Sequence, residues 1–263
     1  MCGPGKNVGV TGNGERGTGK MKWNKKFEYP ASIRSSIEGK RHYEITGQKL
    51  PSVTTILSAT QSPEKKAKLE EWKKRVGTQQ ADRIRDVSAM RGTAMHTYLE
   101  GYILGENHLD LTSIGQEAGK MANVVIQSGL KDLEEVWGSE VTLYYPGLYA
   151  GATDVVGIYD GKESIIDFKQ TNKPKQREWI GDYFVQLAAY AMAHNHVYGT
   201  KIQNGVILMC SKDCFFQKFE VSDKEFKGYM HEFLRRVDEY YKIVPIVPTG
   251  EQGSGTKNEA KDE

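Results

Sequence analysis

The sequence has little cysteine and no long apolar run, and both shortages limit what the protein can be. Its 263 residues include three cysteines, Cys2, Cys210 and Cys214. This odd, sparse count argues against a disulfide framework from an oxidising compartment, and no pair of CxxC motifs suggests zinc. No segment approaches the roughly 18 consecutive apolar residues of a membrane span, and the N-terminus lacks the apolar stretch of a secretory signal. We therefore expect an intracellular, cytoplasmic protein with reduced thiols and no membrane partner.

The net charge of +2 is small, but the basic residues concentrate near the N-terminus. Residues 1–50 contain ten lysines and arginines against four glutamates. Such a segment is compatible with a polyanionic partner, although most charge runs are simply solvated. Composition predicts three regions: a flexible Gly-rich and basic arm over 1–49, a folded domain over 50–245 and a disordered tail over 246–263.

Helix signals dominate the first half of the domain. A capping Ser62, a proline at the first helical position and a glycine stop predict a strongly charged helix over 63–76. A longer helix should follow over 78–104, because its apolar residues recur at helical spacing. The same spacing predicts another helix over 115–138.

The pattern changes at Glu140. Residues 140–170 are rich in β-branched and aromatic side chains and are punctuated by Pro-Gly and Asp-Gly, which predicts a meander of three antiparallel strands. A helix over 177–199, two strands over 203–221 and a C-terminal helix over 222–244 should follow. This order predicts an α/β (α+β) fold in which helices flank a central mixed sheet that contains the antiparallel meander.

The second hairpin of the meander carries an unusual set of charges. Asp160 and Gly161 suit a type I′ turn, which needs positive φ at both central positions. Counting outward from that turn places Asp154 opposite Asp167, where like charges repel each other. Lys169 should share their face because strand side chains alternate. A bound cation would relieve the repulsion.

This set of groups suits metal-dependent hydrolysis of a phosphodiester. Carboxylate oxygens bind Mg²⁺ or Mn²⁺, which supplies a hydroxide-like nucleophile and neutralises charge on the phosphate. A lysine can orient the attacking water or offset the same charge. The alternative is a structural Asp-Lys ion pair on a solvent-facing sheet.

The rest of the chain favours the first interpretation. His96 on a preceding helix, Asp154, "DFK" at 167–169, and Gln186 and Tyr190 in "QLAAY" occur in the order of the PD-(D/E)XK nuclease superfamily, and the chain resembles its RecB-like branch. Within that branch, "RGTAMHTYLE", "DFKQTNKPK" and "QLAAYAMAHNH" look like the mitochondrial genome maintenance exonucleases and related phage exonucleases. The resemblance implies a restriction-endonuclease-like core with an N-terminal helical region.

The resemblance also implies roles for individual residues. His96, Asp154 and Asp167 would bind one or two Mg²⁺ or Mn²⁺ ions, together with the backbone carbonyl of Phe168. Lys169 would be the catalytic lysine beside the two aspartates. Some relatives hold an iron-sulfur cluster with four cysteines, and this chain has too few for us to expect one.

Several of these side chains also have a structural interpretation. Gln186 and Tyr190, one helical turn apart, would complete the catalytic set by steadying Lys169 or a substrate phosphate, yet alone they read as an ordinary amphipathic helix. His96 lies beside an apolar stripe, where most histidines are core residues. Glu100, four residues later, could bind a second metal or be a structural acid.

Together these features predict a Mg²⁺- or Mn²⁺-dependent deoxyribonuclease. We expect an exonuclease that acts on single-stranded DNA or DNA ends in replication, recombination or phage DNA metabolism. The helix over 63–76 could form an arch that admits an end. The expected substrate contacts are basic residues near the site: Arg91, Lys173, Lys175 and Arg177. A flap- or branch-selective endonuclease of the same fold and a non-catalytic DNA-binding module are the alternatives.

Overall fold

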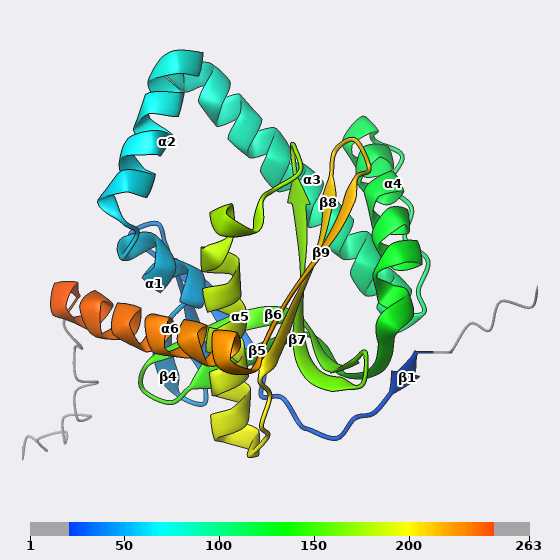
Figure 1. The fold of residues 1–263 in the computed structure, drawn as a ribbon, viewed down its shortest axis with the longest axis vertical. Helices are drawn as coiled ribbons and strands as arrows, with labels where there is room; N and C mark the ends of the chain where they lie inside the picture. Colours follow the sequence, from blue (N-terminus) through cyan, green and yellow to red (C-terminus); the bar gives the residue numbers. More distant parts are fainter. Residues whose placement is uncertain (1–20, 245–263) are drawn as a thin grey trace, which may run out of the picture.

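A six-stranded sheet organises the protein in the computed structural model, which describes residues 21–244 (Figure 1). The strand order is β1-β5-β6-β7-β8-β9. The strands are β1 (Lys22–Trp23), β5 (Leu133–Tyr145), β6 (Tyr149–Tyr159), β7 (Lys162–Thr171), β8 (Asn204–Ser211) and β9 (Phe216–Ser222). Strands β5, β6 and β7 form the antiparallel meander, whereas β7 and β8 run parallel. The predicted mixed sheet is confirmed.

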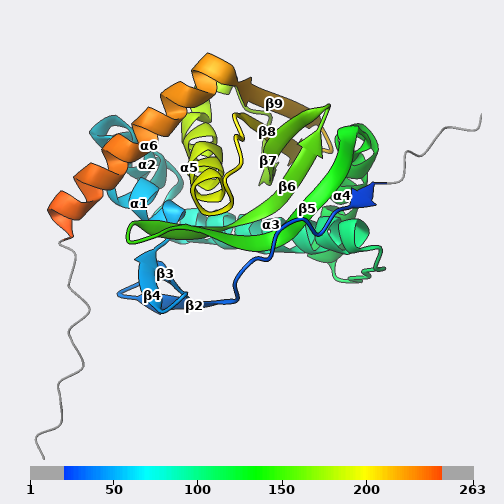
Figure 2. The same cartoon turned by 90° about the horizontal axis from the view of Figure 1, so that it is seen from below.

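Helices cover both faces of this sheet (Figure 2). They are α1 (Val53–Ala59), α2 (Pro63–Val76), α3 (Thr78–Leu104), α4 (Ser113–Ser128), α5 (Gly181–Tyr198) and α6 (Asp223–Ile243). Ile166 and Phe168 join the core under α3 and α4, while Ile165 joins the core under α5 and α6. The alternation expected for β7 is therefore confirmed. None of the helices within residues 21–244 combines the length and apolar character needed to cross a membrane.

Helices α2 and α3 have the predicted bounds, and local signals explain why. The Ser62 side chain accepts a hydrogen bond from the Lys65 N–H, which caps α2. Gly77 separates the two helices with a φ of 84°. Helix α2 contains no buried residue, and it projects from the sheet together with the first part of α3 (Figure 1). Its charged sequence therefore stays in solvent on most sides.

The predicted helix over 115–138 is wrong in its second half. Helix α4 ends at Ser128, a short 3₁₀ turn (Leu130–Asp132) follows, and β5 already begins at Leu133. Gly129 interrupts the helix, and residues 133–138 pair with β6 instead. Sheet pairing outweighs the helical spacing of these apolar residues.

Residues 22–49 belong to the predicted flexible arm, although the alternating pattern from Arg41 onward also predicts short strands, and in the structure they are largely strands. Besides β1, they contribute to a three-stranded sheet of β2 (Ser32–Ile37), β3 (Lys40–Ile45) and β4 (Gln48–Pro51). Two-residue turns at 38–39 and 46–47 have positive φ at both positions, as tight hairpins require. Buried Tyr43 packs with Ala150 of β6, which fixes this small sheet to the body. Residues 1–20 and the predicted tail over 246–263 lie outside the described residues.

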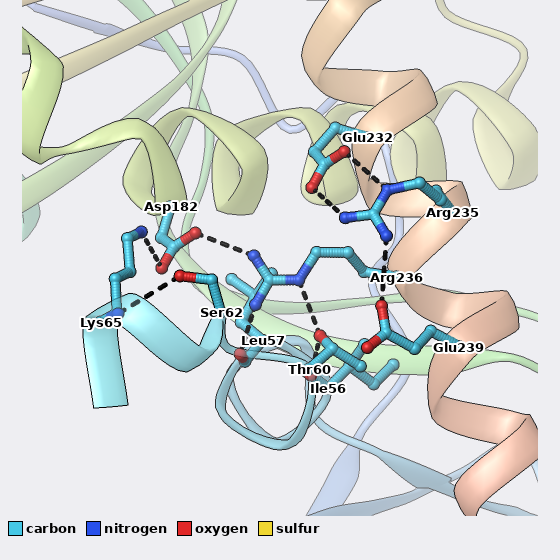
Figure 3. Close-up of polar contacts among 10 residues, drawn as sticks. All are labelled: Ile56, Leu57, Thr60, Ser62, Lys65, Asp182, Glu232, Arg235, Arg236 and Glu239. Atoms are coloured by element: carbon cyan, nitrogen blue, oxygen red, sulfur yellow. Dashed lines mark hydrogen bonds and ion pairs between the residues drawn. The ribbon is translucent and has the colours of Figure 1, made fainter. Parts of the chain in front are cut away.

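A buried arginine on α6 ties the projecting α1–α2 segment to the body (Figure 3). Arg236 is 5% exposed, and its guanidinium donates to Thr60 Oγ1 at 2.7 Å, to the Leu57 carbonyl and to Asp182 Oδ1 at 2.8 Å. Lys65 of α2 reaches the other Asp182 oxygen at 2.8 Å. Asp182 therefore links α2 and α6 to the first turn of α5.

Replacing Arg236 with methionine should destabilise the protein by about 3 kcal/mol, because the Leu57 carbonyl and Asp182 lose their buried donor. Neighbouring Arg235 is the matched control, since its pairs with Glu232 and Glu239 are exposed and its alanine variant should change stability by less than about 1 kcal/mol. Urea unfolding of both variants checks this. Equal losses for the two variants would contradict the anchoring role.

The β5–β6 pairing depends on a glycine. A Cβ at Gly157 would lie 1.9 Å from the Glu135 carbonyl oxygen, so Gly157→Ala must push the irregular part of this ladder apart. We expect a loss of at least about 2 kcal/mol in urea unfolding. Gly228, exposed on α6 with open space at its Cβ, is the control, and Gly228→Ala should stabilise by about 0.5–1 kcal/mol. A neutral Gly157→Ala would show that the strands can separate locally.

Candidate active site

The hairpin has the predicted register up to the charged residues. The β6–β7 pairs run from Tyr159 with Lys162 to Val155 with Ile166. Regular pairing ends there, one step before Asp154 and Asp167. Beyond this point β6 continues with β5, and β7 continues with β8. The two aspartates therefore stand where neighbouring strands part.

Their side chains occupy the opening. Asp154 Oδ2 accepts a hydrogen bond from the Phe168 N–H at 2.5 Å, and Asp154 Oδ1 lies 3.1 Å from His96 Nδ1. Asp167 Oδ2 lies 2.5 Å from Lys169 Nζ, but it has no partner with hydrogen-bond geometry among the described residues. Asp154 and Asp167 are 8% and 4% exposed. Two buried carboxylates thus share one location with one histidine and one lysine.

A cleft of about 450 Å³ opens over these groups. It gathers seven of the residues singled out from the sequence: His96, Glu100, Asp154, Asp167, Lys169, Gln186 and Tyr190. Helix α3, strands β6 and β7, and helix α5 each supply part of this set. The structure therefore brings together side chains that are spread over nearly a hundred positions of the chain.

Helix α5 covers one side of the cleft through Gln186 and Tyr190. Gln186 Nε2 donates to Tyr190 Oη at 2.9 Å. Tyr190 lies so close to Gly151 of β6 that a Cβ there would be 2.7 Å from its ring. Tyr183 lies one helical turn before Gln186, and its ring centroid is 5.0 Å from Lys169 Nζ, a cation–π contact.

Glu140 is the functional candidate that sequence reasoning missed. The β5–β6 register places it opposite Asp154, and its Oε1 lies 4.0 Å from His96 Nδ1. Ligand atoms of these three residues all lie within 4.8 Å of one another. Counting outward from the turn that follows Tyr145 would have found Glu140, because the same count pairs Val141 with Thr153.

The protonation states of the cluster reflect its crowded charges. Burial alone would lower the pKa of His96, but Asp154 outweighs it and raises that pKa to about 9. Partial burial, and then the Asp154 charge, raise the pKa of Glu140 to about 7. Burial likewise raises the pKa of Asp167, whereas His96 and Lys169 overcome burial and lower the pKa of Asp154. Without a metal, protons partly neutralise the site.

The four basic residues predicted as substrate contacts do not line the cleft. Arg91 is 6% exposed and donates to Glu117, Gln170 and Asn172, so it connects α3 to the end of β7. Arg177 binds Glu225 through both carboxylate oxygens at 2.9 Å. The other two, Lys173 and Lys175, lie in the connection between β7 and α5.

Comparison with known proteins confirms the predicted resemblance. The chain is 28% identical over 228 residues to mitochondrial genome maintenance exonuclease 1 of Xenopus tropicalis, covering 82% of this chain and 64% of that protein. The Mus musculus protein of the same name is 30% identical over 200 residues, with 73% and 59% covered. The Homo sapiens protein is 30% identical over 203 residues, with 73% and 58% covered. The chain thus spans about three-fifths of the length of these curated relatives.

Two further comparisons add less. No family model matches the chain. Among solved structures, a protein from Eubacterium rectale aligns over 58% of this chain and 68% of its own, at 11% identity and a TM-score of 0.42. The assignment of the fold therefore rests on the strand order and helix placement described above.

The raised pKa values predict that the metal-free protein loses stability as pH rises. The folded state keeps a proton on Glu140 up to about pH 7 and on His96 up to about pH 9, while the unfolded chain releases them near the ordinary pKa values of 4.5 and 6.5. Stability from these protons is therefore complete at low pH and declines through both intervals. Urea unfolding in EDTA between pH 5 and 9 measures the decline.

Glu140→Gln should flatten the part of this decline between about pH 4.5 and 7, because the amide stays neutral. Glu134→Gln, which changes an exposed glutamate on the same strand, is the matched control and should leave the profile unchanged. An unchanged profile in the Glu140 variant would show that its carboxyl titrates normally.

Proposed function

We propose that this chain, which is similar in sequence to mitochondrial genome maintenance exonucleases, is a metal-dependent DNA exonuclease. One observation carries the proposal: His96, Asp154, Asp167 and Lys169 meet in a single cleft where β6 and β7 separate. The alternative of a structural ion pair on a solvent-facing sheet fits poorly. Both aspartates are buried, and the charges of His96 and Lys169 act on both of them.

The residues present fit a divalent cation. Asp167 Oδ2 is buried beside Lys169 and has no partner with hydrogen-bond geometry among the described residues, and ligand atoms of His96, Glu140 and Asp154 lie within 4.8 Å of one another. Carboxylate oxygens with one imidazole suit Mg²⁺ or Mn²⁺. We propose that His96, Asp154 and Asp167 hold the ion, with the Phe168 carbonyl as predicted. The ion would make a water molecule more acidic and neutralise charge on the scissile phosphate.

The other groups of the site position the reactants. Phe168 N–H and His96 fix both oxygens of Asp154, so its carboxylate cannot rotate away. Lys169 stays charged because Asp167 outweighs burial and raises its pKa. Its ammonium group can therefore orient an attacking water or stabilise negative charge on the phosphate. Gln186 and Tyr190, joined by a hydrogen bond, would steady this lysine and the substrate from α5.

Two further features agree with this proposal. Helix α2 and the start of α3 project from the body and could form the arch that admits a DNA end (Figure 1). Cys210 and Cys214 are free thiols, which suits an intracellular location. The proposed substrate is DNA, either a single strand or a free end.

The purified protein should degrade end-labelled linear single-stranded DNA with Mg²⁺ or Mn²⁺, and EDTA should abolish this activity. Asp167→Ala and Lys169→Ala should each lower the rate at least about a hundredfold, because the first removes a proposed metal ligand and the second removes the ammonium group that stabilises negative charge on the phosphate. Lys162→Ala, on the exposed hairpin turn of the same strand, is the control and should cut like wild type.

Closed circular single-stranded DNA distinguishes the two nuclease classes. An exonuclease leaves the circle intact and degrades the linear form of the same sequence. Cleavage of the circle at a comparable rate would replace the proposal with an endonuclease. If neither DNA is cut by wild type, or if both alanine variants cut normally, the enzymatic proposal is wrong.

A further inference from the structure

The small sheet contributes two arginines to the cleft. Arg34 of β2 and Arg41 of β3 line it together with the aspartates. Arg34 pairs with Tyr43 and Arg41 pairs with Ser36, so both arginines lie on one face of the sheet as diagonal neighbours, about 7–8 Å apart. Their long side chains can therefore extend from neighbouring positions toward two phosphates of one nucleic-acid strand.

The cleft is rich in carboxylates, so these two arginines supply positive charge that a polyanionic substrate needs. Four carboxylates line it, namely Glu100, Glu140, Asp154 and Asp167. A polyanionic substrate therefore needs cationic groups to approach, and Lys169 is already paired with Asp167. Arg34 and Arg41 are exposed, and neither forms an ion pair with any residue in the range 21–244. Their guanidinium groups are open to a ligand.

The hollow surface continues past Arg41. This residue and Thr54 line both the cleft and a second hollow of about 320 Å³, whose other residues include Lys40 and Ser58. The two hollows therefore adjoin at Arg41 of the small sheet and Thr54 of α1, and a strand that leaves the aspartates past Arg41 would enter the second one. A single strand can follow this route by its sugar-phosphate backbone.

We propose that Arg34 and Arg41 bind two neighbouring phosphates of the single DNA strand whose end lies at the aspartates. Each guanidinium can form two hydrogen bonds to one phosphate, and together they set which bond reaches Asp154 and Asp167. The contacts are to the backbone, so they bind every sequence alike. This inference rests on the proposed function for its choice of substrate.

The test measures binding of a fluorescein-labelled oligothymidylate at several salt concentrations. All proteins carry Lys169→Ala, which prevents digestion during the titration. The double variant Arg34→Ala/Arg41→Ala should bind about a hundredfold more weakly. The slope of log affinity against log salt should fall by about 0.7 per lost phosphate contact, or about 1.4 in total.

Two control variants make this result specific. Lys49→Ala removes a cation from β4 that pairs with Glu44 and does not line the cleft, and it should change neither affinity nor slope. Arg34→Lys/Arg41→Lys should keep the slope, because the charges remain, but recover only part of the affinity. In otherwise wild-type protein, the double alanine variant should raise KM for linear DNA.

The outcomes separate this inference from the proposed function. If the double alanine variant binds with wild-type affinity and slope, the phosphate contacts do not exist, whatever the enzyme cuts. The phosphate contacts would also be overturned if the double alanine variant and Lys49→Ala changed affinity and slope by the same amount. If the Lys169→Ala protein binds the oligonucleotide with the expected arginine dependence but the wild-type protein cuts no DNA, the exonuclease proposal is wrong. The proposed phosphate contacts of Arg34 and Arg41 then still hold.

Discussion

The separation of β6 from β7 is the constraint on which the site depends. After Val155 and Ile166 the two strands stop pairing, because β7 continues beside β8 and β6 continues beside β5. The opening would leave a backbone N–H without a partner, and the Asp154 carboxylate accepts it from Phe168. Asp154, which accepts the hydrogen bond that the sheet no longer provides, is thus also a candidate metal ligand. Its backbone role fixes the carboxylate in place.

The same opening concentrates negative charge in a buried place. Burial and mutual repulsion raise the pKa values of Glu140 and Asp167, while Asp154 raises that of His96. These directions describe a site that takes up positive charge, either as protons or as a cation. A purely structural cluster would be easier to stabilise with apolar side chains of similar size. The arrangement therefore favours a cation-binding function over a role in stability.

Elements far from the sheet opening frame the cleft. Arg236 fixes the junction of α1 and α2 against Asp182 at the start of α5, the helix that also carries Gln186 and Tyr190 (Figure 3). The small sheet also lines the cleft, through Arg34, Arg41 and Tyr43. Because Tyr43 packs beside Ala150 of β6, the arginines of this sheet keep a defined position relative to the aspartates. The cleft is thus assembled from several independent supports.

The features that could be predicted from the sequence are those that follow local rules. The turn at 160–161 set the register of Asp154 and Asp167, and the Ser62 and Gly77 signals set the bounds of α2. Each of these depends on the conformational preferences of a few adjacent residues. The motif order of the site residues predicted that they would meet, and they line one cleft. Their individual roles remain predictions.

The remaining features follow from long-range contacts, because the responsible partners are distant in the chain. Residues 133–138 have helical spacing, but pairing with β6 makes them a strand. Arg91 is basic and near the site in sequence, yet Glu117 and the end of β7 bury it. Arg41 reaches the cleft because its small sheet packs against Ala150 of β6. Such contacts depend on which strands become neighbours, and local propensity does not contain that information.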